Sequence, residues 1–214
     1  MIVFLAACGQ SSSNAENNSL VMADTTRSTT EVTAPLPFLL PDTTIKFLWR
    51  ENRYHEEYKD SVSYIVINED YCKIIPDQCK AAIGYVATFV GNECWWDGNA
   101  NNDRSNLKCK ILTALNLGYQ CSDTHLGYLK HWFKGDEKSI KELEFENCPT
   151  TPYTSTIQDT FDEITLIVKG DEIQVHFKAT AMNTREQSTS SWIETDYFQY
   201  SKEHIRLINK EEKL

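Results

Sequence analysis

The spacing of apolar residues changes character at Cys148, and this change constrains the fold more than any other feature of the sequence. Before that residue, apolar positions recur every three or four residues, as they do on one face of an α-helix. After it, apolar and polar residues alternate, as they do in strands with one buried face. The sequence therefore predicts an α+β protein, with helices within 70–148 and strands within 158–210.

Four segments of the first region have helical spacing. Residue types that favour helix starts or ends bound them, with proline or aspartate before and glycine after most of them. A further segment, 63–67, either adds a strand or leads into the first helix. The predicted helices cover residues 76–91, 103–118, 122–135 and 136–145.

Four consecutive antiparallel strands are predicted after Cys148. Residues 164–168 and 173–179 alternate on either side of a polar turn, which is typical of a hairpin. Residues 192–200 alternate again, and a short apolar segment at 205–207 completes the set. We therefore expect one domain over residues 41–214, in which disulfide-stapled helices pack on a four-stranded meander.

The N-terminal residues carry a signal for export and lipidation. Residues 5–8 read Leu-Ala-Ala-Cys, which resembles the lipobox of bacterial lipoproteins. The resemblance implies cleavage before Cys8, diacylglycerol on its sulfur and an acyl chain such as palmitate on the new amino terminus. A signal peptide also has a basic start and a longer apolar core. We therefore expect residues 1–7 to be a remnant and translation to begin upstream of Met1; the alternative is an ordinary thiol near the N-terminus.

Residues 8–40 are expected to form a disordered tether. They are rich in Ser, Thr, Asn and Ala, and have too little apolar surface to offset the entropy of ordering. Gly9 rather than Asp follows Cys8, and the lipoprotein resemblance then implies delivery to the outer membrane. The expected location is the periplasmic side of that membrane, with the lipid anchor as the only membrane contact.

Six further cysteines lie in the predicted folded body. An even number in an exported protein predicts disulfides, although sequence alone permits other pairings. If the first two helices form an antiparallel hairpin, cysteines at their ends lie close together. A zinc site needs closer cysteine pairs than the sequence offers, so no metal is expected. The predicted bonds are Cys79–Cys121, Cys94–Cys109 and Cys72–Cys148.

The strand region resembles the C-terminal half of the NTF2-like, or cystatin-like, superfamily. The resemblance rests on the long hairpin over 164–177, on Trp-Ile-Glu-Thr-Asp-Tyr-Phe at 192–198 and on Ile-Arg-Leu-Ile at 205–208. It implies a curved sheet that wraps the helices and leaves a conical cavity.

Two carboxylates of the third predicted strand are candidates for that cavity. Glu194 and Asp196 share a strand face with Trp192 and Phe198 if the alternation is strict. Pointing inward, they would have raised pKa values and could serve as a general base. A bulge that turns them to solvent is the outcome we expect for charged groups.

Two further motifs lie near Cys94. Trp95 and Trp96 either pack against a disulfide or expose one indole as a partner-binding anchor. Residues 97–103 resemble the start of a calcium loop, but they lack its glycine and its closing glutamate. An Asx-rich loop that caps the next helix is expected instead. No nucleophile, phosphate-loop or metalloprotease motif is found, so neither catalysis nor a cofactor is expected.

The net charge of −10 makes nucleic acid an improbable partner, because phosphate binding requires clustered Lys and Arg. These features together predict a non-enzymatic lipoprotein that binds a periplasmic or envelope protein. Toxin-immunity proteins and inhibitors of cell-wall hydrolases have this profile, and an acidic surface complements a basic lysozyme-like target. The alternatives are an NTF2-like small-ligand binder or enzyme, and a structural envelope lipoprotein.

Overall fold

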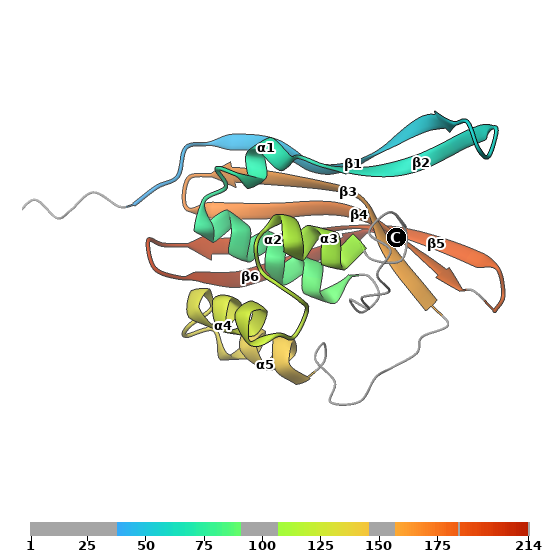
Figure 1. Ribbon diagram of the computed structural model, residues 1–214. Coiled ribbons are helices and arrows are strands. Elements are labelled where there is room, and N and C mark those ends of the chain that lie inside the picture. Colours follow the sequence, from blue (N-terminus) through green and yellow to red (C-terminus); the bar gives the residue numbers. More distant parts are fainter. Residues whose placement is uncertain (1–37, 91–106, 146–156, 184, 214) are drawn as a thin grey trace, which may run out of the picture. The chain divides into compact units, whose positions relative to one another are not determined.

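The computed structural model describes residues 38–90, 107–145, 157–183 and 185–213, all within a unit that spans Pro37–Leu214. Two strands come first, helices follow, and the remaining strands end the chain (Figure 1). The elements are β1 (Thr43–His55), β2 (Asp60–Ile67), α1 (Glu69–Cys72), α2 (Asp77–Phe89), α3 (Leu107–Ala114), α4 (Asp123–Trp132), α5 (Glu137–Phe145), β3 (Ile157–Lys169), β4 (Glu172–Asn183), β5 (Ser188–Tyr200) and β6 (Ile205–Lys213).

The strands form one antiparallel sheet in the order β2-β1-β3-β4-β5-β6. The predicted α+β class and the meander β3 to β6 are confirmed. The sheet is larger than predicted, because β1 adds to the free edge of β3 and β2 pairs with β1. Of these two strands the sequence analysis anticipated only the end of β2.

One face of the sheet is apolar over most of its width, and the helices cover it (Figure 1). Strand register places Ile45, Leu166, Val175, Asp196 and Lys210 in one row across this inner face. The first three belong to the buried core or pack against it. The row therefore runs from aliphatic residues on β1, β3 and β4 to a carboxyl group on β5 and an ammonium on β6.

The opposite face of the sheet is polar. The neighbouring row contains Lys46, Thr165, His176 and Thr195, and none of these side chains is buried. His176 Nδ1 on β4 lies 2.8 Å from Thr195 Oγ1 on the neighbouring β5. An antiparallel sheet with one apolar and one polar face needs a helical layer on one side only.

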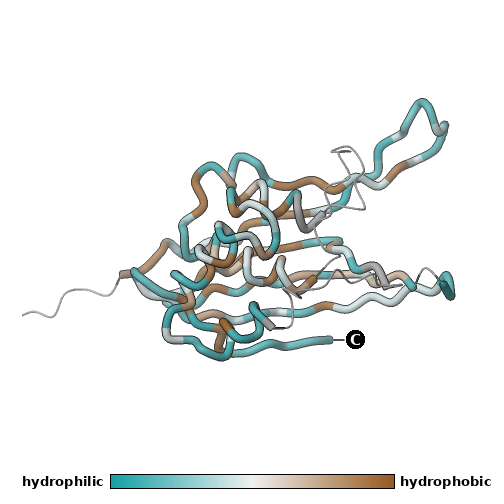
Figure 2. Tube along the Cα trace, turned by 60° about the horizontal axis from the view of Figure 1, so that its bottom comes forward, coloured by the Kyte–Doolittle hydropathy of each residue, from teal (hydrophilic) through white to brown (hydrophobic). Residues whose placement is uncertain are grey.

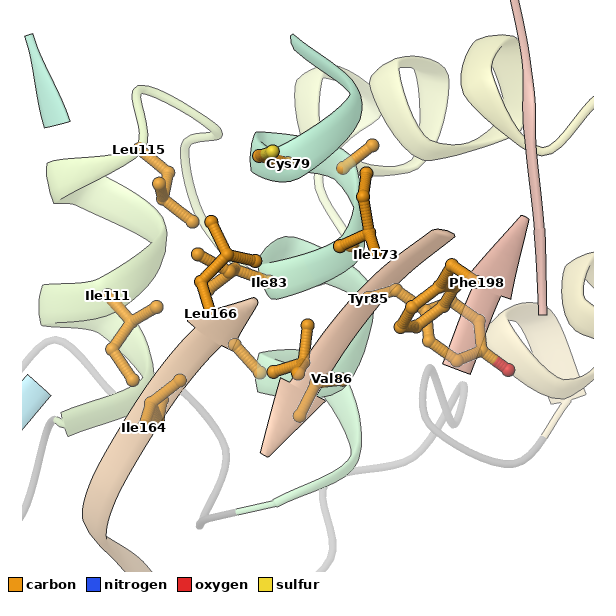
Figure 3. Close-up of a cluster of buried hydrophobic side chains, with 14 of the residues drawn as sticks. Cys79, Ile83, Tyr85, Val86, Ile111, Leu115, Ile164, Leu166, Ile173 and Phe198 are labelled. Carbon is orange, nitrogen blue, oxygen red and sulfur yellow. The ribbon is translucent and has the colours of Figure 1, made fainter. Parts of the chain in front are cut away.

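Helix α2 lies against the sheet and forms the centre of the core. Ile83 and Val86 face the strands, and Figure 3 shows them among side chains of α3, β3 and β4. In Figure 2 apolar residues recur along the strands and helices, whereas the C-terminal end of β6 is hydrophilic. Gly84 lets the Leu117 side chain lie close to the backbone of α2, since a Cβ at position 84 would lie 2.5 Å from Leu117 Cδ1.

The predicted helix over 76–91 is confirmed as α2, and the two later predictions correspond to α4 and α5. Helix α4 begins as expected, because the Ser122 Oγ accepts a hydrogen bond from the His125 backbone N–H at 3.2 Å. Helix α3 lies within the predicted 103–118, of which residues 103–106 fall outside the described part of the chain.

The predicted Cys79–Cys121 bond is wrong, because Cys79 is a free thiol buried in the core. It shares the sheet-facing side of α2 with Ile83 and Val86 (Figure 3), and it hydrogen-bonds with Tyr71. Burial raises the pKa of the Cys79 thiol to about 12. The side chain therefore faces the sheet and α1.

The predicted Cys72–Cys148 bond is also absent, because Cys72 is a free, half-buried thiol at the end of α1. Cys72 is half-buried because α1 packs Tyr71 and Cys72 against the core. Cys121 is disulfide-bonded, and its partner lies outside the described side chains. The predicted Cys94–Cys109 pair falls outside them as well.

Candidate functional site

The sequence-predicted site residues separate into two groups. Cys8, Trp95 and Trp96 lie outside the described residues. Glu194 and Asp196 lie on β5, on the face that the helices cover. The structure also adds an exposed hairpin that the sequence analysis did not identify, and it is described after the carboxylates.

Asp196 is buried, with 2% of its surface exposed. Its Oδ2 lies 3.7 Å from Lys210 Nζ on the paired position of β6. Its Oδ1 has no hydrogen-bond partner among the described residues. The Lys210 ammonium also lies 4.7 Å from the centre of the Phe89 ring and 5.5 Å from that of Tyr85. The carboxyl group of Asp196 and the ammonium of Lys210 thus lie together under α2.

Burial raises the pKa of Asp196 to about 8. The Lys210 ammonium lowers this pKa and the neighbouring Glu194 carboxyl raises it, so desolvation remains the dominant cause. Asp196 therefore keeps its proton to a higher pH than an exposed aspartate does. A carboxylic acid in this state can donate a hydrogen bond as well as accept one.

Aromatic side chains fill the space beside Asp196. Tyr85 stacks on Phe133 with ring centroids 4.7 Å apart and meets Phe198 edge-on at 5.8 Å. Its hydroxyl donates to Glu142 Oε2 at 2.7 Å. Burial raises the pKa of Tyr85, and the bond to Glu142 raises it further. This packing resembles a filled core more than the open cone that the NTF2-like resemblance implies.

The expectation that a bulge turns both carboxylates to solvent is wrong for Asp196. The sheet does have a bulge here, but the extra residue is Ile208 on β6, because Tyr197 pairs with Asn209 and Phe198 with Leu207. Strand β5 keeps its alternation, so Asp196 stays on the face of Phe198. Glu194 is only half-buried.

A second candidate site is the end of the β1–β2 hairpin. Strand β1 pairs with β3 only over Thr43–Leu48, whereas it pairs with β2 from Leu48 to His55. Residues 51–64 therefore form a two-stranded ribbon, which we call the arm. Figure 1 shows the arm extending from the sheet on the side away from α4 and α5.

A polar network holds the base of the arm on the sheet. Arg50 Nε donates to Asp162 Oδ1 at 2.6 Å, and its Nη2 contacts Thr160 Oγ1 at 3.3 Å. Thr180 Oγ1 donates to the other oxygen of Asp162 at 2.6 Å. Asp162 is the extra residue of a bulge in β3. A two-stranded ribbon is marginally stable alone, so this anchor fixes where the arm leaves the sheet.

The arm presents aromatic side chains to solvent. Tyr54 is 62% exposed and Tyr58 is 67% exposed. The His55 and Tyr58 rings stack with centroids 4.4 Å apart, and the Arg53 guanidinium lies over the Tyr64 ring at 5.6 Å. Tyrosine and arginine are enriched in protein–protein interfaces, where they supply much of the binding energy.

The sequence contained a signal for the arm, of which the prediction used only residues 63–67. Residues that favour strands recur at every second position before and after the turn. After the turn they are Val62, Tyr64 and Val66, and before it the segment that contains Trp49 alternates in a similar way. The intervening Glu56 and Glu57 read as a solvated charged stretch. They occupy the turn between the two strands.

The described residues contain no group of three or more His, Cys, Asp or Glu side chains that could hold a metal ion. None of the described helices combines the length and hydrophobicity that crossing a bilayer requires. Comparison with protein-family models, with curated proteins and with solved structures finds no match for this chain. The NTF2-like resemblance and the lipobox stay predictions.

Proposed function

We propose that this chain is a non-enzymatic, lipid-anchored protein of the bacterial envelope that binds another protein through the β1–β2 arm. The observation that carries the proposal is the arm itself, a ribbon that leaves the sheet with Tyr54 and Tyr58 exposed near its tip. Exposing a large aromatic side chain to water is unfavourable, and burying it against a partner surface is favourable.

The charge of the arm favours a basic partner. Residues 51–64 contain four acidic and two basic side chains, and the whole chain has a net charge of −10. Complementary charge speeds association and selects partners. A cationic periplasmic enzyme or toxin fits this surface, which supports an inhibitor or immunity role.

The anchor part of the proposal rests on the Leu-Ala-Ala-Cys motif at residues 5–8. A lipid on Cys8 would hold the protein at the membrane through a segment rich in Ser, Thr and Asn. The arm could then meet partners in the periplasm. A Cys8→Ser variant should move from the membrane fraction to the soluble fraction.

Removing the tyrosines of the arm is expected to abolish partner capture. The native protein should recover one envelope protein in stoichiometric amount, and Tyr54→Ala with Tyr58→Ala should recover at least about tenfold less. Both side chains are exposed, so the double variant should keep its unfolding midpoint. Quantitative mass spectrometry of the captured fraction measures the effect.

The matched control is Tyr119→Ala, which removes a tyrosine that is 53% exposed in the segment between α3 and α4. It should capture as much partner as the native protein does. Equal capture by all three proteins would show that the arm is not the binding surface.

A second candidate function is small-ligand binding or proton chemistry at Asp196. The observation that favours it is the unpaired Oδ1 of a buried carboxylic acid beside Lys210. Carboxyl groups whose pKa is strongly shifted by burial are common at functional sites. The aromatic packing around Tyr85 weighs against it, and we rank it below protein binding.

A further inference from the structure

A pocket of about 410 Å³ lies between the α4–α5 turn and the β5–β6 hairpin. Its lining includes Lys134 from the turn, and His204 and Arg206 from the hairpin. The two segments are held together by a hydrogen bond from the Leu207 backbone N–H to Asp136 Oδ2 at 3.1 Å. Three basic side chains thus line one pocket of a strongly acidic chain.

The carboxylate within the lining, Asp136, makes its hydrogen bonds to other groups and forms no ion pair with these three side chains in the described part of the chain. Asp136 Oδ1 accepts a hydrogen bond from the Ser139 backbone N–H at 3.2 Å, and its Oδ2 accepts from the Ser139 hydroxyl at 2.7 Å. With the Leu207 N–H, both oxygens are engaged and the side chain is buried. Asp136 therefore shapes the pocket wall.

The basic side chains keep donors for a ligand. Arg206 Nη2 donates to Gln199 Oε1 at 3.3 Å, which is a neutral acceptor, and no ion pair of this guanidinium occurs among the described residues. The Lys134 ammonium lies 3.5 Å from a carboxylate oxygen of Glu203, whose side chain is exposed to solvent. His204 Nδ1 contacts Ser201 Oγ at 2.8 Å, so Nε2 is the ring nitrogen that this contact does not use. Exposed ion pairs of the Lys134 type are weak, and an anion can replace them.

We propose that this pocket binds a phosphate group, carried by a small soluble molecule or by a phospholipid headgroup. Phosphate accepts several hydrogen bonds at once, and a guanidinium matches its geometry with paired N–H groups. A phosphate monoester carries close to two negative charges at neutral pH and a phosphodiester headgroup carries one, and the oxygens of either can contact a lysine and an arginine together. This function is separate from partner binding, because the pocket residues belong to the α4–α5 turn and the β5–β6 hairpin, whereas the arm belongs to β1 and β2.

Titration with inorganic phosphate at low ionic strength tests the proposal. The probe protein is the full chain with Cys8→Ser, so that no lipid anchor contributes. Saturable heat of binding is expected, and Lys134→Gln with Arg206→Gln should raise the dissociation constant about tenfold or more. Both side chains are exposed, and an unchanged unfolding midpoint would verify that the variant folds.

The matched control removes two lysines from the outer face, with Lys46→Gln and Lys178→Gln. It changes the net charge equally and should leave the dissociation constant within about twofold. Equal weakening in both variants, or no saturable binding in the parent protein, would overturn the proposal.

Vesicles separate the two sources of phosphate. Retention on phosphatidylglycerol vesicles that phosphate competes away, and that the pocket variant loses, assigns the site to a lipid headgroup. Saturable phosphate binding without retention on these vesicles assigns it to a soluble phosphorylated molecule. Both results support a phosphate site, and neither depends on the arm.

Discussion

Asp196→Asn is expected to flatten the pH dependence of stability between about pH 4 and pH 8. The pKa of Asp196 is about 8 in the folded protein, against an ordinary value of 3.8. Within this window the folded chain keeps a proton that the unfolded chain releases. The stability that protonated Asp196 contributes is therefore complete below about pH 4 and is lost as the pH rises towards 8, by up to about 1.4 kcal/mol per pH unit.

Urea unfolding at pH 5, 6, 7 and 8 measures this difference. The variant removes the titrating group, so its stability relative to the native protein should improve by up to about 4 kcal/mol from pH 5 to pH 8. Glu163→Gln is the control, because it removes a carboxylate from the exposed outer face. A parallel pH profile for Asp196→Asn and the native protein would mean that the folded chain does not hold Asp196 protonated.

Asp136→Ala is expected to destabilise the fold by about 2–4 kcal/mol, by uncoupling α5 from the sheet. The carboxylate precedes α5 and caps it through the Ser139 N–H. It also accepts the Leu207 N–H of β6, which would lose its partner in a half-buried setting. Chemical denaturation at a fixed pH near 7 measures the loss.

Ser122→Ala is the matched control for this prediction. Ser122 caps α4 through the His125 N–H but makes no bond to the sheet in the described structure. The substitution should lower the free energy of unfolding by only about 1 kcal/mol, the usual contribution of an N-cap. Equal losses in the two variants would show that the bond from Asp136 to β6 contributes nothing beyond the cap.

Local patterns predicted α2 to α5 and the meander because each of these elements repeats one periodicity, whereas the four-residue α1 is too short for a pattern and was not predicted. Helix α2 follows a proline and keeps helical spacing, and β3 to β6 alternate around short polar turns. The first two strands were harder to predict. Their polar tip interrupts the alternation, and β1 pairs with β3 about 120 residues later in the chain, which no local pattern encodes.

The candidate sites depend on tertiary packing, and the sequence analysis was less accurate there. Asp196 was a candidate on strand alternation alone, but its burial depends on α2 covering β5. The location of the bulge on β6 rather than β5 decided its orientation. Cys79 was assigned to a disulfide because it lies at a helix start, yet its direction is set by the face of α2 that contacts the sheet.

Crosslinking from the arm in intact cells tests the protein-binding role most directly. A photoreactive phenylalanine analogue in place of Tyr58 should give one defined adduct, and the same analogue in place of Tyr119 should not. Tyr58 lies at the tip of the arm, whereas Tyr119 lies on the helical side at similar exposure. No adduct from position 58, or the same adducts from both positions, would contradict the proposal that the arm binds a partner.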